Sequence, residues 1–281
     1  MKRRIGVHVS IAGGLDRGLE RARDLGCTTV QMFSHNPRGW AIGKRRPEEI
    51  AQFMALKQTY DIYPVFIHTS YLINLASSRP DLSERSAAMV EEELSIADQV
   101  GAEHVVLHTG SASGEDPAIA RKRAVMALNR IAEQGAWKAG LLLENTAGER
   151  GDITSRVNEL SEIMEQVATG LIAGICIDTC HAFAAGYDIS TEEGIGGLAS
   201  EVQRYCGRDM LKLVHFNDSK KPAGAGVDRH EHLGEGAIGE KGLRRFVNHE
   251  FFAGIPLILE TPKNSDADDR RNLGIVRRFF N

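Results

Sequence analysis

Seven residues that can bind metal ions or move protons follow directly on short apolar runs along the sequence. They are His8, His68, His108, Glu144, Asp178, His215 and Glu260. An eighth run ends at Ser34 or His35. With 38 acidic residues and 10 histidines among 281 residues, chance would place only one or two of these types at eight such positions. Imidazole and carboxylate groups without thiolates suit Zn²⁺, Mn²⁺ or Fe²⁺ at a catalytic site, rather than a closed structural zinc site.

The run that ends at Asp178 also carries a histidine three residues later, His181. Taken alone, this stretch fits two roles equally well: Asp178 or Thr179 can be the N-cap of a following helix, or the stretch can belong to a metal site. The place of Asp178 among the other run-end residues favours a metal ligand over a cap.

A further pair of candidate ligands lies between the last two apolar runs. Asp228 and His230 are two residues apart and face the same way in an extended segment, so they can bind one ion together. His232 shares that face, but we interpret it as a supporting or helix-capping residue. We interpret His8 as a hydrogen-bonded polar residue, because a ligand needs partners of suitable geometry. The whole set holds too many carboxylates and imidazoles for one metal ion, so the sequence predicts a cluster.

Alternating apolar runs and amphipathic segments must position these residues. The expected strands are Arg4–Val9, Thr28–Phe33, Pro64–Ile67, His104–Leu107, Gly140–Leu143, Ile172–Ile177, Leu211–Phe216 and Pro256–Leu259. The expected helices are Leu15–Leu25, Pro47–Tyr60, Leu82–Val100, Ala118–Trp137, Thr154–Ala168, Thr191–Tyr205, Glu240–Glu250 and Ala267–Phe279, with stops at Gly26, Gly101 and Gly170. This pattern predicts an α/β fold, a single-domain (β/α)8 TIM barrel over residues 1–281, whose strand ends meet at one mouth. An open doubly wound sheet is the alternative, but no GxGxxG follows the first expected strand.

Composition limits the possible binding partners and cellular location of the protein. A net charge of −4 gives no indication of nucleic-acid binding, although three bound divalent cations would reverse its sign. No apolar run approaches the ~18 residues of a membrane span, and the N-terminus does not resemble a signal peptide. The four cysteines form no CxxC pair, so we expect reduced thiols and a cytoplasmic protein.

Several longer motifs resemble the endonuclease IV family of zinc-dependent apurinic/apyrimidinic (AP) endonucleases, which act in base-excision DNA repair. These motifs are Cys176–Asp188, His232–Gly236, Ser70–Leu75, Glu144–Gly148 and Leu259–Pro262. The resemblance extends in the same order from Ile5 to Pro262. Thr109 is a departure, since the family more usually has proline there, and this puts the shape of the local loop in doubt but not the ligand role of His108.

The resemblance implies three zinc ions per chain, with Mn²⁺ as an alternative at one site. It implies these ligands: His68, His108 and Glu144 for the first ion; Glu144, Asp178, His215 and Glu260 for the second; and His181, Asp228 and His230 for the third. Glu144 would bridge two ions and is the residue we expect to be catalytic. The resemblance also implies that Arg38, Tyr71 and Leu72 bind DNA, with the arginine entering the base stack and the other two entering through the minor groove.

The activity implied by the resemblance is hydrolysis of the phosphodiester 5′ to an abasic site in duplex DNA. The products would be a 3′-hydroxyl and a 5′-deoxyribose phosphate, and 3′-blocking lesions would also be trimmed. Two metal ions about 3.5 to 4 Å apart can lower the pKa of a water that they share and direct it at phosphorus. We expect a monomer with no obligate protein partner and no membrane association.

Two other functions compete with this interpretation. A sugar isomerase or epimerase of the related barrel type would use one or two Mn²⁺ or Mg²⁺ ions held by Glu144, Asp178, His215 and Glu260, but it would leave the remaining candidate ligands unexplained. A non-catalytic DNA-damage binding module would use structural zinc, and the carboxylate-rich set argues against it.

Overall fold

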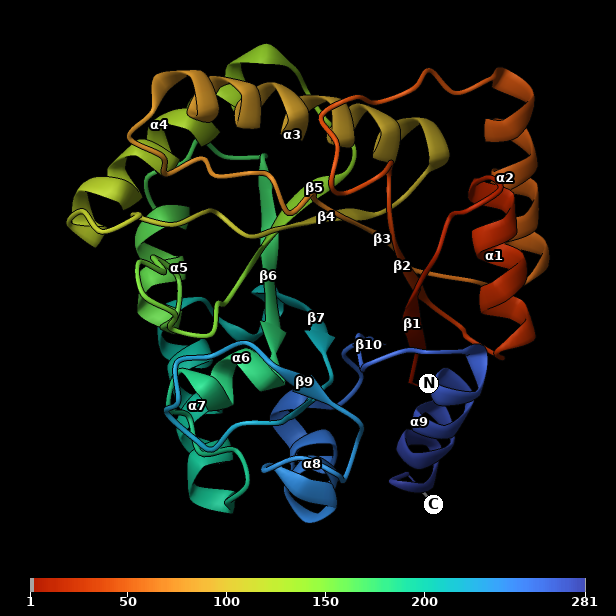
Figure 1. Cartoon of the computed structure of the whole chain (residues 1–281), viewed down its shortest axis with the longest axis vertical. Coiled ribbons are helices and arrows are strands. Elements are labelled where there is room, and N and C mark those ends of the chain that lie inside the picture. Colours follow the sequence, from red (N-terminus) through yellow and green to blue (C-terminus); the bar gives the residue numbers. More distant parts are fainter. Residues whose placement is uncertain (1–2, 281) are drawn as a thin grey trace.

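Eight parallel strands form the centre of the protein in a computed structural model that describes residues 3–280. The strands are β1 Ile5–Val9, β2 Val30–Phe33, β3 Val65–His68, β4 His104–Leu107, β5 Gly140–Glu144, β6 Ile172–Asp178, β7 Leu211–His215 and β10 Leu257–Leu259. They close into a barrel in the order β1-β10-β7-β6-β5-β4-β3-β2 (Figure 1). All eight expected strands are therefore confirmed, and each end lies within two residues of its expected position. The chain is a single-domain TIM barrel.

Helices surround the strands on the outside of the barrel (Figure 1). The long helices are α1 Leu15–Asp24, α2 Pro47–Thr59, α3 Pro80–Val100, α4 Pro117–Gln134, α5 Val157–Met164, α7 Glu192–Tyr205, α8 Gly239–Asn248 and α9 Asp266–Arg278. Shorter ones are α6 Thr179–Ala184, η1 Arg208–Met210 and η2 Glu250–Phe252. Gly101 ends α3 with a φ of 66°, as expected. The expected stop at Gly170 is wrong, because α5 already ends at Met164.

One layer of apolar side chains fills the interior of the barrel, and it explains where the candidate ligands point. Its members are Phe66, Val106, Leu142, Cys176, Leu213 and Ile258. Residues two apart on a strand face the same side, so the next inward position lies two residues further on. Those next positions are His68, His108, Glu144, Asp178, His215 and Glu260. The pleat of the strands thus places six candidate ligands in one ring at the C-terminal mouth.

The loop after β7 contains a small additional sheet. Strands β8 Asp218–Ser219 and β9 His230–Glu231 pair antiparallel, with Ser219 opposite His230. This pairing makes the segment around His230 extended, as the spacing of Asp228 and His230 predicts. Among residues 3–280, no helix has the length and apolar character needed to cross a membrane.

Candidate metal centre

Glu144 lies at the centre of the barrel mouth and has no exposed surface. Four imidazole nitrogens approach its carboxylate: His108 Nε2 at 2.8 Å, His215 Nδ1 at 2.9 Å, and His68 Nε2 and His181 Nδ1 at 3.3 Å each. The buried carboxylate of Glu144 thus contacts candidate ligands from β3, from β7, from the end of β4 and from the start of α6.

The His, Asp and Glu donor atoms at the mouth form three overlapping groups, and within each group they lie within 4.8 Å of one another. Two further groups of the described residues include Cys176 or Cys180. The three groups without cysteine are His68, His108 and Glu144; Glu144, Asp178, His215 and Glu260; and Asp178, His181 and His230. Asp228 adjoins the third group, with Oδ2 3.2 Å from His181 Nε2 and Oδ1 3.3 Å from His230 Nε2. The first two groups share Glu144, and the last two share Asp178. All nine predicted ligands therefore lie in one continuous set.

Asp178 has two roles that the sequence analysis treated as alternatives. Its Oδ1 accepts a hydrogen bond from the N–H of His181 at 2.8 Å and so caps α6. Its Oδ2 faces the site, 3.6 Å from His230 Nε2 and 4.0 Å from His215 Nδ1. The sequence analysis was wrong to set the metal-ligand role against the capping role, because one oxygen of the carboxylate caps the helix while the other faces the site. Capping fixes the carboxylate and also places His181 one turn away.

The hydrogen bonds of three histidines show that the site suits cations. The Nδ1 atoms of His68, His181 and His230 lie 2.8, 2.9 and 3.0 Å from backbone carbonyl oxygens, which can only accept, so each Nδ1 donates. In the neutral ring, Nε2 then carries a lone pair. Each of these Nε2 atoms faces a carboxylate oxygen at 3.2 to 3.3 Å. Two electron pairs repel at that distance unless a proton or a metal ion lies between them, so the donor set fits metal ions as well as protonated histidines.

The ionisation of the site also favours positive charge. Burial alone would lower the pKa of His181, but the negative charge of Asp178 and contacts with Asp228 and Glu144 raise it well above 6.5. Burial would raise the pKa of Asp228, but the hydrogen bond and charge of His181 lower it to about 2. Burial likewise opposes ionisation of Glu144, yet the charges of His215 and His108 hold its pKa well below 4.5. The carboxylates thus remain anionic, and protonated histidines or bound metal ions can balance their charge.

Two amides that the sequence analysis did not single out orient the ligands. Gln31 of β2 accepts from His215 Nε2 at 2.7 Å through Oε1, and it donates to Glu260 Oε1 at 2.6 Å through Nε2. Asn217 donates to Asp178 Oδ2 at 2.7 Å and accepts from the N–H of Glu260 at 2.8 Å. The only sequence signal that could have identified these two amides is a polar residue within an apolar strand or shortly after one.

The two histidines with unassigned roles lie at the edge of the site. His8 Nδ1 is 3.3 Å from Glu260 Oε1 and 3.0 Å from Gln31 Nε2. His8 belongs to none of the compact donor groups among residues 3–280. His232 Nδ1 lies 3.0 Å from Asn272 Nδ2, which also donates to Thr261 next to Glu260. His232 therefore contacts the supporting structure around the site.

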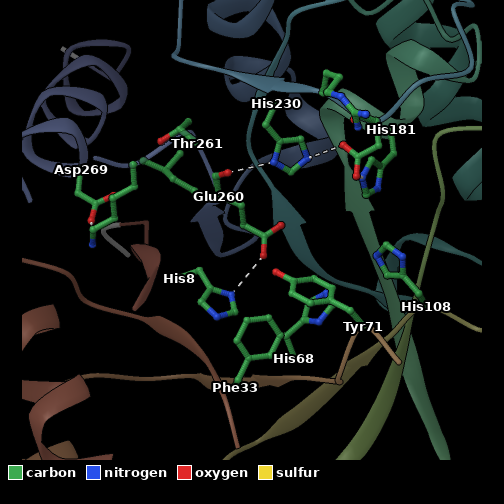
Figure 2. Close-up of a pocket in the computed structure, with 14 residues that line it drawn as sticks. His8, Phe33, His68, Tyr71, His108, His181, His230, Glu260, Thr261 and Asp269 are labelled. Atoms are coloured by element: carbon green, nitrogen blue, oxygen red, sulfur yellow. Dashed lines mark hydrogen bonds and ion pairs between the residues drawn. The ribbon is translucent and has the colours of Figure 1, made fainter. Parts of the chain in front are cut away.

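Above the ligands lies a cavity of about 390 Å³, which His8, Phe33 and Tyr71 line on one side (Figure 2). Tyr71 is 67% exposed, and its ring is 5.1 Å from that of Phe33. Leu72 is half-buried and lines a neighbouring hollow that also borders His68 and His108. Arg38 is exposed and lines a separate cavity that shares His8 and Phe33 with the first. The three predicted DNA-binding residues therefore surround the ligand ring without belonging to it.

Comparison with known proteins agrees with this architecture. Residues 19–278 match the family model described as a xylose isomerase-like TIM barrel. The protein named "Probable endonuclease 4" from Methanoculleus marisnigri is 42% identical over 276 residues, which cover 98% of this chain and 98% of the relative. The protein of the same name from Halothermothrix orenii is 40% identical and is matched over 98% of this chain and 99% of its own length.

Solved structures give the same result. Endonuclease IV from Thermus thermophilus superimposes with a TM-score of 0.87 at 36% identity, covering 99% of this chain and 98% of that one. A D-tagatose 3-epimerase-like protein reaches a TM-score of 0.73 at 18% identity, covering 98% and 97%, so it shares the fold alone. Full-length identity near 40% together with this superposition shows that the chain belongs to the endonuclease IV family.

Proposed function

We propose that this protein is an AP endonuclease that cleaves the phosphodiester 5′ to abasic sites in duplex DNA. The products are a 3′-hydroxyl and a 5′-deoxyribose phosphate, and 3′-blocking lesions are also removed. The observation that carries the proposal is the continuous set of three donor groups, joined through Glu144 and Asp178, in a barrel of this family. The enzyme acts as a monomer, and its AP endonuclease domain spans residues 1–281.

The donor set would hold three Zn²⁺ ions, with Mn²⁺ as an alternative at one position. When bound, the ions would activate a water for attack on phosphorus and neutralise charge on the phosphate oxygens. Glu144 would bridge the first two donor groups and fix the distance between them. Its burial excludes bulk water, which strengthens every electrostatic interaction at the mouth.

Residues in the loops around the mouth would select the substrate. Tyr71 and Leu72 would fill the space that the missing base leaves, and Arg38 would enter the stack from the neighbouring cavity. A missing base removes stacking and pairing, so turning that nucleotide into the cavity costs less than at an intact pair. Selectivity would thus come from DNA deformability.

The first experiment tests the activity and its dependence on the ligands. Glu144→Gln and His108→Ala should each lower cleavage of a duplex with one abasic site by about 100-fold or more, because ligand loss weakens metal binding and activation. Far-ultraviolet circular dichroism should show a folded barrel in both variants. Chelator should abolish wild-type cleavage, and elemental analysis should give three zinc ions per chain. Cleavage near the wild-type rate in both variants would contradict the proposal.

A sugar isomerase or epimerase is a second candidate, because Glu144, Asp178, His215 and Glu260 alone form a four-ligand group. This function leaves the donors His68, His108, His181, Asp228 and His230 without a purpose. One Mn²⁺ per chain together with turnover of a ketose, and no cleavage of abasic duplex, would favour it.

A further inference from the structure

Helix α3 presents a row of polar side chains to the loops at the barrel mouth. Ser83 and Ser86 are one turn apart, and Glu93 lies two turns further along the same face. Ser86 Oγ accepts from the N–H of Asn74 at 3.0 Å, and Ser83 Oγ donates to the carbonyl of Leu75 at 3.3 Å. This face of α3 therefore holds the backbone of the loop that follows β3.

Glu93 is the acidic member of this row, and its side chain has no exposed surface. Its Oε1 accepts from the N–H of Ser70 at 3.1 Å and lies 3.5 Å from both Ser34 Oγ and His35 Nδ1. Its Oε2 is buried and has no hydrogen-bond partner among residues 3–280. Burial raises the pKa of Glu93 to about 8. A carboxyl group at such a position carries a large desolvation cost, and it belongs to none of the compact donor groups that the described residues form.

The contacts of Glu93 join two different loops. Ser70 directly precedes Tyr71 and Leu72, whereas Ser34 and His35 begin the loop that carries Arg38. The two loops also touch directly, since Ser70 Oγ donates to the carbonyl of Pro37 at 2.8 Å. One buried oxygen of α3 thus lies at the junction of both segments.

Two further contacts stabilise the Arg38 loop around this junction. His35 Nε2 lies 3.2 Å from the carbonyl of Gly39, so His35 donates there and its Nδ1 accepts from Ser34 Oγ at 2.8 Å. Arg85 of α3 lies over the ring of Trp40, 4.4 Å from its centroid. Helix α3 therefore holds both ends of the loop between Ser34 and Trp40.

We propose that Glu93 is a positioning residue for DNA recognition, which fixes the Arg38 loop and the Tyr71 loop relative to each other so that both engage one abasic site. This inference rests on the proposed function of the two loops. Glu93 is buried and belongs to none of the donor groups that the described residues form, so it would act on substrate binding and not on the chemical step.

The test compares Glu93→Ala with Glu92→Ala, which removes the exposed neighbouring carboxylate of the same helix. In zinc-loaded protein we expect Glu93→Ala to raise KM for a duplex with one abasic site about tenfold, while kcat and zinc content stay within about twofold. Glu93→Gln keeps an acceptor for the Ser70 N–H and should restore KM to near the wild-type value. Glu92→Ala should leave both constants unchanged. If Glu93→Ala does not fold, Glu93→Leu fills the same space without an acceptor and replaces it.

Combination with the loop variant separates the two proposals. Tyr71→Ala with Leu72→Ala should raise KM for abasic duplex while leaving competition by intact duplex unchanged. Adding Glu93→Ala to this pair should raise KM by less than its effect alone, because one of the two loops that Glu93 positions has already lost its DNA-contacting side chains. An unchanged KM in the loop pair would refute the role of the loops. Three outcomes would overturn the Glu93 proposal while leaving the role of the loops intact. The effects of the loop pair and of Glu93→Ala on KM could be fully additive, folded Glu93→Ala could have an unchanged KM, or Glu93→Ala could lose zinc.

Discussion

The carboxyl group of Glu93 binds its proton more tightly in the folded protein than in a free glutamate, because burial raises its pKa to about 8. Below the ordinary value of 4.5 both the folded and the unfolded chain hold this proton, so the group has no effect on the pH dependence of stability. Between 4.5 and 8 the unfolded chain loses the proton while the folded chain keeps it. The contribution of Glu93 to the free energy of unfolding therefore falls as pH rises, by about 1.4 kcal/mol per pH unit.

Glu93→Gln should remove this dependence, because an amide does not ionise. The free energy of unfolding of the variant relative to wild type should increase by up to about 4 kcal/mol from pH 5 to pH 8. Urea unfolding at both pH values, at equal metal loading, measures the difference, and effects common to both proteins cancel. Glu92→Gln, at an exposed position, should show no such trend. An equal difference at the two pH values would show that Glu93 titrates normally.

Individual residues show which parts of the site could be predicted from the sequence and which could not. The nine predicted ligands lie together because each stands at a strand end or in a distinctive motif. Gln31 was missed because an amide in an apolar strand has no characteristic spacing, and its role depends on how β2 lies relative to β7 and β10. The double role of Asp178 was missed because the sequence cannot show which oxygen faces the helix.

At the scale of elements, the β8–β9 sheet holds Asp228 and His230 over the mouth through one buried aspartate. Asp218 accepts hydrogen bonds from five backbone N–H groups, those of Ser219, Gly234, Gly236, Ile238 and Gly239, at 2.8 to 3.3 Å. A Cβ at Gly236 would lie 2.4 Å from Asp218 Oδ1, so the loop packs too tightly for any other residue there. Asp218 thus fixes the chain that directly follows β9, and with it one end of the segment that carries His230.

Asp218→Ala should release the segment that carries His230. We expect loss of one zinc ion per chain and about a 10- to 100-fold fall in cleavage of abasic duplex, because support of a ligand is lost while the barrel strands are unchanged. Elemental analysis and a nicking assay measure the two effects. Asp209→Ala, an exposed aspartate in η1 ahead of β7, is the matched control and should be neutral. Three zinc ions in Asp218→Ala would show that β9 holds its position without the anchor.

The strands were more predictable than the elements between them. Apolar runs bounded by polar residues indicated all eight strands, because burial on both faces leaves a continuous signal. Helix α6 was considered only as the alternative that Asp178 or Thr179 would cap, since six residues are too few to show a helical period. The end of α5 was placed at Gly170 because glycine often ends helices, but the segment after Met164 turns without it. The β8–β9 pairing joins residues a dozen positions apart, and no local pattern specifies it.

At the scale of the whole molecule, the candidate ligands come from strands β3, β5, β6, β7 and β9, from helix α6 and from loops, between positions 68 and 260. Within residues 3–280 no short segment holds a complete donor group, so the unfolded chain has little affinity for the metal ions. Ions that bind only the folded state stabilise it by RT ln(1 + [L]/Kd), about 2.7 kcal/mol at one hundred times Kd. Closure of the barrel and metal binding should therefore be coupled.

Removal of metal should lower Tm by about 5 °C or more at neutral pH, since a chain of this size shifts by about 2 to 4 °C per kcal/mol. Differential scanning calorimetry with and without chelator measures the shift, and added zinc should restore it in proportion to the logarithm of its concentration. The difference should vanish as pH falls, because protons compete with metal for the histidines and carboxylates. An identical Tm for the metal-loaded and metal-free protein at pH 7 would show that metal binding and folding are not coupled.

The pairing of β1 with β10 determines when the site can first exist during synthesis. Ile5, Gly6 and Val7 lie beside Leu257, Ile258 and Leu259, and α9 packs against β1 (Figure 1). The ribosome delivers the chain from its N-terminus, so the strands up to β7 emerge before the one that closes the ring. Glu260, which follows β10, is the last of the nine ligands to appear. A growing chain therefore carries an open sheet and an incomplete centre, and the nuclease becomes competent to cut DNA only when its closing strand is made.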